Sequence, residues 1–212
     1  MFIAFDGIDG AGKTTIYQKI ADELSEDYEV QLFDMGKLGF LDDVIKNIKT
    51  GKNRCDANIR EYLYYFEGNL FSDQIARRYV KDKKRHILID RYILSYMSYG
   101  PLNGVPIEKI RLVTKQMIWP DLYFYIDTKP EIALERILKY RDIDKPEIGF
   151  GNSLSDNQNS NKDSFIKFQT QVRRNFQSAI NMIKGDVHII DNDISTSHAI
   201  ENIKTILNQQ IL

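Results

Sequence analysis

The stretch FIAFDGIDGAGKTT, residues 2–15, decides the fold of this 212-residue chain. Four apolar residues open it, as in a buried strand, and residues 7–14 then match the spacing G-x-x-x-x-G-K-[ST]. Ile16, Ile20 and Leu24 follow at four-residue spacing, which predicts a helix directly after the loop. A glycine-rich loop between a strand and a helix directs backbone N–H groups at phosphate oxygens. The stretch therefore predicts a binding site for a nucleoside triphosphate.

We expect the residues of this loop to share the binding of ATP. The contacts would come from Gly7, Gly10, Ala11, Gly12, Lys13, Thr14 and Thr15. Lys13 would reach the β and γ phosphates, and the hydroxyl of Thr14 would coordinate Mg²⁺. Asp9 is unusual, because a carboxylate inside this loop repels phosphate. Two interpretations stay open: Asp9 orients an acceptor or a metal-bound water, or it is a turn residue that points to solvent.

Short apolar runs alternate with segments of helical period over the rest of the chain. After residues 2–5, such runs lie at 30–33, 86–90, 122–126 and 187–190. Strands that alternate with helices predict a parallel sheet with crossover helices, and runs that are apolar throughout predict cover on both faces. We therefore predict an α/β fold: a P-loop NTPase-type parallel five-stranded sheet flanked by helices on both faces, with a lid loop.

Asp90 and Arg91 end the third of these apolar runs. The carboxyl edge of an open α/β sheet is where such folds bind ligands, so both side chains would emerge beside the phosphate loop. Asp90 would support Mg²⁺ through an intervening ligand, which makes Thr14 and Asp90 the predicted metal site. Arg91 could bind a phosphoryl group with both arms of its guanidinium. The alternative is a strand-end pair that merely caps a helix.

Residues 149–162 interrupt the pattern, because they are rich in Gly, Asn and Ser and follow the charged run 141–145. A long loop of this kind is either a lid over an active site or a surface insertion. The length of the chain predicts a single domain, residues 1–212, with the lid at about 141–162.

Composition excludes several classes of function. Lys and Arg number 29 against 30 Asp and Glu, so no global charge favours nucleic acid. No apolar run reaches the roughly 18 residues of a membrane span. The N-terminus lacks the features of an export signal, so we expect a cytoplasmic protein. Cys55 is the single cysteine, which excludes an internal disulfide.

Several segments, taken in order, resemble the thymidylate kinases. The resemblance rests on residues 5–15, on Asp90-Arg91-Tyr92 with Ser95 and Tyr99, on 120–122, on 130–136, on Phe168, Val172 and Phe176, and on 189–191. It implies a homodimeric nucleoside monophosphate kinase that transfers the γ-phosphoryl group of ATP to dTMP with Mg²⁺.

The resemblance also implies roles for individual residues. Asp9 and Arg91 would position the acceptor phosphate, Phe66 would stack on the base, and Tyr99 would crowd the sugar 2′ position. The full set of acceptor contacts would be Asp9, Lys37, Phe66, Arg91, Ser95 and Tyr99. The variable positions of the phosphate loop hold no arginine, so the cation that acts on the transferred phosphoryl group would be Arg141 or Arg136. The catalytic residues would be Asp9, Lys13, Arg91 and Arg141.

The chain departs from this family where the base is read. Leu70 stands where the family has an arginine that reads the thymine edge, and Tyr96 stands where it has Asn or Gln. Losing hydrogen bonds to the base removes selectivity. The segment after the second strand lacks the family's arginine and proline, and Lys37 would substitute as a point charge. Two alternatives therefore stay open: a kinase of deoxynucleosides or other small molecules, and an ATP-binding module without transfer activity.

Overall fold

The computed structural model describes residues 1–50, 52–80, 82, 84–149, 154–155, 157–183 and 185–211. The strands of these residues are β1 (Phe2–Gly7), β2 (Glu29–Asp34), β3 (Arg85–Asp90), β4 (Leu122–Asp127) and β5 (His188–Asp191). The α-helices are α1 (Lys13–Leu24), α2 (Asp42–Lys49), α3 (Ala57–Phe71), α4 (Arg77–Tyr79), α5 (Ile93–Tyr99), α6 (Ile107–Thr114), α7 (Pro130–Leu138), α8 (Gln158–Met182) and α9 (Thr196–Ile211). The shorter helical segments are η1 (Ser72–Ala76), η2 (Pro101–Asn103) and η3 (Lys145–Ile148).

The five strands form one parallel sheet in the order β2-β3-β1-β4-β5. All six residues of the central strand β1 are buried, whereas the edge strands β2 and β5 are mostly half-buried or exposed. This gradient follows from position, because a central parallel strand has neighbours on both edges and helices on both faces. The predicted five-stranded parallel sheet is confirmed.

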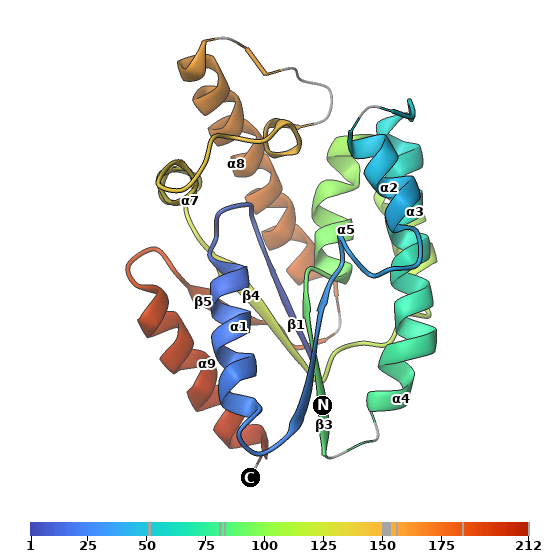
Figure 1. The fold of residues 1–212 in the computed structure, drawn as a ribbon, viewed down its shortest axis with the longest axis vertical. Helices are drawn as coiled ribbons and strands as arrows, with labels where there is room; N and C mark the ends of the chain where they lie inside the picture. The colour runs from blue at the N-terminus through green and yellow to red at the C-terminus, as the bar shows by residue number, and fades with distance from the viewer. Residues whose placement is uncertain are drawn as a thin grey trace.

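Helices cover both faces of the sheet (Figure 1). α1 and α9 lie together on one face, and α5 and α8 lie on the other. Ile16, Ile20 and Leu24 on α1 are buried as their spacing predicts. Because the connections after β1 and β3 go to opposite faces, a crevice opens at the carboxyl ends of these neighbouring strands. The phosphate loop follows β1 and Arg91 follows β3, so the topology brings the two to the same edge.

The predicted loop at residues 149–162 is shorter in the structure. Residues 158–162 are the first turn of α8, and Lys145–Ile148 form the helical segment η3. Asn157 caps α8 by accepting a hydrogen bond from the N–H of Asn159 at 3.0 Å. The polar composition therefore reflects in part a helix start, for which asparagine is a favoured cap. Residues 150–153 and 156 of the predicted lid lie outside the described residues.

Among the described residues, no helix is both long enough and apolar enough to cross a membrane.

Candidate functional site

The phosphate loop joins β1 to α1 through backbone conformations that require glycine. Gly10 and Gly12 have φ angles of 76° and 86°, in the left-handed region. A Cβ atom on Gly10 would lie 2.5 Å from the carbonyl oxygen of Ala133, so the loop also packs against α7 too closely for a side chain. α1 begins at Lys13, and the first N–H groups of a helix lack intrahelical partners. The loop and the helix start therefore present hydrogen-bond donors in one place.

Lys13 is held under this loop. Its side chain is 6% exposed, and its ammonium donates a hydrogen bond to the carbonyl oxygen of Ile8 at 2.9 Å. Burial lowers the pKa of Lys13, and the nearby Arg91 guanidinium lowers it further. A buried ammonium with a neutral acceptor is electrostatically under-satisfied, so an anion placed on the loop would gain a strong interaction.

Thr14 and Asp90 meet as the sequence predicts. The hydroxyl of Thr14 donates a hydrogen bond to Oδ2 of Asp90 at 2.9 Å. Oδ1 of Asp90 is buried and has no hydrogen-bond partner among the described residues. A hydroxyl and a carboxylate with an unused oxygen suit Mg²⁺, which takes few protein ligands and keeps water and phosphate oxygens as the others. No group of three or more His, Cys, Asp and Glu side chains suited to a metal occurs in the described part of the chain.

Arg91 leaves β3 with a φ of 70°, a left-handed conformation that is uncommon for a residue with a side chain. Its N–H donates to the carbonyl oxygen of Phe5 at 2.8 Å. Its guanidinium then returns over the phosphate loop, where one nitrogen lies 3.4 Å from both the Gly7 carbonyl oxygen and the Ser95 hydroxyl. The other nitrogen pairs with the Asp9 carboxylate. Arg91 therefore does not cap α5, and that alternative is wrong.

Asp9 carries more partners than a turn residue needs. Besides Arg91, its carboxylate accepts hydrogen bonds from the Tyr99 hydroxyl at 3.1 Å and from Nε2 of Gln169 at 3.0 Å. Oε1 of Gln169 also accepts the N–H of Asp9, at 3.2 Å. Burial alone would raise the pKa of Asp9, but Arg91, Lys13 and these hydrogen bonds outweigh it and hold the pKa below its usual value. The interpretation of Asp9 as a solvent-facing turn residue is therefore wrong.

Asp6, three residues earlier, anchors the backbone around Arg91. Its carboxylate accepts hydrogen bonds from the Tyr92 N–H at 3.1 Å and from the hydroxyls of Ser95 and Tyr123. Asp6 is fully buried, and burial raises its pKa despite these donors. The contact with Tyr92 fixes the chain directly after Arg91, which keeps the guanidinium over the loop.

A cavity of about 580 Å³ adjoins the phosphate loop. Its lining includes Gly10, Gly12, Lys13, Thr14, Thr15, Arg136 and Arg141. Five of the seven predicted ATP-binding residues and both candidate cations therefore border one space, whereas Gly7 and Ala11 are not part of its lining. Arg141 is held by Glu147, at 3.0 Å from one guanidinium nitrogen, and by Asp144 at 3.2 Å. Hydrogen bonding to Glu147 raises the pKa of Arg141.

Two of the residues predicted to contact the nucleoside, Lys37 and Phe66, are more exposed than the charged side chains at the phosphate loop. The Lys37 side chain is 80% exposed and its ammonium lies 3.7 Å from the Asp34 carboxylate. Phe66 on α3 is 57% exposed. Tyr99 lies against the site instead, with the Arg91 guanidinium 5.1 Å from its ring centroid.

Tyr96, which replaces the family's Asn or Gln, is buried between α5 and α3. Its hydroxyl donates a hydrogen bond to the carbonyl oxygen of Tyr64 at 2.9 Å. A Cβ atom on Gly68 would lie 2.1 Å from this hydroxyl, so the phenol fills the space beside α3. Sδ of Met35 also lies 2.8 Å from this hydroxyl, so its single hydrogen already has two acceptors within the protein.

Gln169 is a site residue that sequence reasoning missed. It is fully buried on α8, and its Nε2 also donates to the carbonyl oxygen of Glu147 at 3.0 Å, which links η3 to Asp9. A signal was present, because Gln169 stands on the apolar stripe formed by Phe165, Val172 and Phe176. A polar side chain at a core position needs a partner, but the sequence does not say which one.

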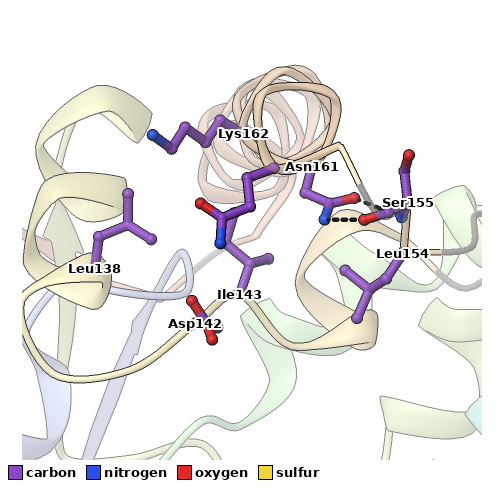
Figure 2. Close-up of a pocket in the computed structure, with 8 residues that line it drawn as sticks. Leu138, Asp142, Ile143, Leu154, Ser155, Asn161 and Lys162 are labelled. Atoms are coloured by element: carbon purple, nitrogen blue, oxygen red, sulfur yellow. Dashed lines mark hydrogen bonds between the residues drawn. The ribbon is translucent and has the colours of Figure 1, made fainter.

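A second hollow, of about 290 Å³, lies between α7, the segment after it and the start of α8 (Figure 2). Leu138, Ile143 and Leu154 give it an apolar lining. Asn161 closes one side by two hydrogen bonds of 2.8 Å with the backbone of Ser155, shown as dashed lines in Figure 2. None of its lining residues belongs to the phosphate loop, so it is separate from the cavity described above.

Comparison with known proteins gives one consistent result. The sequence model of the family described as "Thymidylate kinase" matches residues 5–204. The chain is 31% identical over 160 residues to the thymidylate kinase of Staphylococcus haemolyticus, which covers 70% of this chain and 77% of that protein. It is 32% identical over 148 residues to a probable thymidylate kinase of Methanocaldococcus jannaschii, covering 68% of this chain and 72% of the other.

The fold is also similar to a solved structure. The crystal structure of thymidylate kinase from Ehrlichia chaffeensis superposes with a TM-score of 0.70 over 98% of both chains, at 21% identity. The likeness therefore extends over nearly the whole length of both chains.

Proposed function

This chain belongs to the thymidylate kinase family and is a nucleoside monophosphate kinase, and from that premise we propose that it transfers the γ-phosphoryl group of ATP to dTMP. The observation that carries the proposal is the convergence of Lys13, Asp9 and Arg91 at one edge of the sheet. An ammonium for the donor and a guanidinium for the acceptor then face each other across the phosphate loop. Phosphoryl transfer depends mainly on such positioning and charge.

The donor would lie in the cavity beside the phosphate loop. Backbone N–H groups of Gly10, Ala11 and Gly12 would surround the β phosphate, and the start of α1 would add its unpaired donors. Lys13 would exchange the Ile8 carbonyl oxygen for the β and γ phosphates. The lowered pKa of Lys13 supports this assignment, because a polyanion offsets the cost of burying the ammonium.

Magnesium fits beside Thr14 and Asp90. We propose that the Thr14 hydroxyl would hold the ion and that Asp90, with its unpartnered Oδ1, would orient its water ligands. The ion would supply charge neutralisation for the phosphate oxygens.

The acceptor would enter from the side of Arg91 and Tyr99. Arg91 would bind the acceptor phosphate with its guanidinium, and Asp9 and Ser95 would keep the guanidinium in place. An oxygen of that phosphate would attack the γ-phosphorus, the bond to the β-phosphate oxygen would break, and ADP would leave. Tyr99 would lie against the sugar, Phe66 would stack on the base, and Lys37 would add positive charge.

Two candidates remain for the cation that meets the transferred phosphoryl group. Arg141 borders the cavity and is 46% exposed, so it has room to exchange Glu147 for a phosphate. Arg136 is half-buried, and its guanidinium donates to the carbonyl oxygens of Asn192 at 2.6 Å and of Ala11 at 3.4 Å, which holds it against the backbone beside the phosphate loop. We therefore propose Arg141 as the catalytic cation, carried by a lid at about residues 141–162.

The experiment is a coupled measurement of ADP formation with Mg²⁺, ATP and a panel of acceptors. We expect turnover with dTMP, and lower kcat/KM with other monophosphates. Turnover with nucleosides and not with monophosphates would replace the proposal by a nucleoside kinase. ATP binding without acceptor-dependent turnover would indicate a binding module.

We also propose a homodimer in the cytoplasm, and sedimentation of the purified chain tests the dimer.

A further inference from the structure

We propose that Asn192 is a positioning residue of the ATP site, which orients the peptide unit between Ala11 and Gly12; the inference rests on the proposed use of the phosphate loop for ATP. Asn192 directly follows β5 and is fully buried. Its Nδ2 donates a hydrogen bond to the carbonyl oxygen of Ala11 at 2.8 Å, across 181 residues of sequence. A buried amide from the far end of the chain is therefore in contact with the middle of the phosphate loop.

Three side-chain donors surround the Ala11 carbonyl oxygen. The Thr128 hydroxyl and one guanidinium nitrogen of Arg136 lie 3.4 Å from it. At 2.8 Å the Asn192 contact is the shortest of the three. The carbonyl is therefore held from the β5–α9 turn, with weaker support from the β4–α7 turn and from α7.

Asn192 is itself fixed by its backbone. Its N–H donates to the carbonyl oxygen of Asp127 at 2.9 Å, and its own carbonyl oxygen accepts from Arg136 at 2.6 Å. The first contact continues the pairing of β4 with β5 past the end of the sheet, and the second ties Asn192 to α7. The side chain of Asn192 thus starts from a rigid point, which a positioning group requires.

Orientation matters at this peptide because glycine follows it. Gly12 has a φ of 86° and no side chain, so rotation of the Ala11–Gly12 peptide plane meets little steric resistance. In a planar trans peptide the C=O and the next N–H point in opposite directions. Fixing the Ala11 carbonyl toward Asn192 therefore turns the Gly12 N–H away from Asn192, which does not line the cavity that Gly12 borders. That N–H is the donor offered to the polyphosphate.

The close approach also explains the residue types. A Cβ atom on Gly12 would lie 2.9 Å from Nδ2 of Asn192, so the amide occupies the space that a side chain would need. An aspartate at 192 would place a carboxylate against a carbonyl oxygen and near bound phosphate. A leucine would keep the approximate size of the side chain and lose the donor.

The test measures ATP affinity directly, by equilibrium binding with Mg²⁺ and no acceptor present. We expect Asn192→Leu to weaken ATP binding by about five- to tenfold, as the loss of one oriented donor implies. Asn192→Asp should weaken it further, and magnesium tripolyphosphate should show the same order as ATP. The control is Asn69→Leu, which removes an amide that donates to the Tyr65 and Val113 carbonyl oxygens away from this loop. It should leave ATP affinity within about twofold of the parent.

The NMR chemical shift of the Gly12 amide reports directly on the orientation of this peptide unit. We expect magnesium tripolyphosphate to shift it strongly in the parent and weakly in Asn192→Leu. Equal ATP affinity in the parent and Asn192→Leu would overturn the inference, as would equal losses in Asn192→Leu and Asn69→Leu. If the parent binds ATP without phosphorylating dTMP, the proposed function fails while the affinity comparison still decides the role of Asn192. A parent that binds no ATP would overturn both.

Discussion

The phosphate end and the nucleoside end of the proposed site differ in how far they are built before any ligand arrives. At the phosphate end, Asp9, Arg91, Thr14 and Asp90 already contact one another or their neighbours. At the nucleoside end, Phe66 is 57% exposed and the Lys37 side chain is 80% exposed. The first region lies on the carboxyl ends of central strands, and the second lies on α3 and on the turn after an edge strand.

The difference shows which part of the site must be rigid before a ligand binds and which part need not be. Charged groups beside a buried strand need partners in the folded state, because an unpaired buried charge is costly. Arg91 and Asp9 satisfy each other until phosphate replaces part of that contact. An exposed phenylalanine needs no polar partner in the folded state, and a bound base can cover its ring. We expect chemistry to depend on the first region and acceptor affinity on the second.

The largest expected effect comes from Lys13→Ala. Removing the ammonium should lower kcat/KM for ATP by about a thousandfold, or about 4 kcal/mol of transition-state stabilisation. Stability should not fall, because burial lowers the pKa of Lys13 and the folded state therefore disfavours its charge. Steady-state kinetics and thermal unfolding measure the two effects. Lys19→Ala, an exposed position on the same helix, is the control, and comparable losses in both variants would contradict the assignment.

Arg91→Ala tests whether the two substrates use different groups. It should reduce kcat/KM for dTMP by about a hundredfold while ATP affinity stays within about twofold of the parent. Arg91→Lys keeps the charge but lacks the two-pronged guanidinium, so its kcat/KM for dTMP should lie between the values of the parent and of Arg91→Ala. Kinetics with dTMP varied and equilibrium binding of ATP separate the effects. A loss of ATP affinity as large as that of Lys13→Ala would contradict the division of the site.

Phe66→Ala tests the exposed end. The loss of one base-stacking contact should raise KM for dTMP by about tenfold and leave kcat nearly unchanged, as for binding that is equal in the ground and transition states. Ile59→Ala, at another exposed apolar position of α3, is the matched control. A fall in kcat without a change in KM would show that Phe66 acts on the chemical step instead.

The smallest expected effect is on the pH dependence of stability, to which Asp6 and Asp9 should contribute in opposite directions. The pKa of Asp9 is held below 3.8, so its contribution to stability is present above that pH and is lost as pH falls through the lower folded value. The pKa of Asp6 is raised above 3.8, so its contribution is present at low pH and is lost as pH rises through the folded value.

Urea unfolding of Asp9→Asn and Asp6→Asn between about pH 3 and pH 7 tests this contrast. Relative to the parent, Asp9→Asn should lose stability as pH rises, and Asp6→Asn should gain it. Parallel profiles for both variants would mean that the two carboxylates do not differ in this way.

Local sequence determined the phosphate loop, the five strands and the stripes of α1 and α8. Each depends on residues that are neighbours in the chain: glycines that allow positive φ, an apolar run, or apolar residues at helical spacing. The pairing of Thr14 with Asp90 also followed, because parallel strands bring their carboxyl ends to one edge, whereas the strand order β2-β3-β1-β4-β5 came only from the structure. Composition was a poorer guide to the lid, since residues 158–162 proved to be helix.

Only the tertiary structure decided which polar groups meet across long separations. Gln169 contacts Asp9 over 160 residues, Tyr123 contacts Asp6 over 117, and Asn192 contacts Ala11 over 181. A buried polar side chain requires a partner, but the requirement does not name one. The choice depends on which turns the packed sheet brings within about 3 Å of each other, and that distance exists only once the chain has folded.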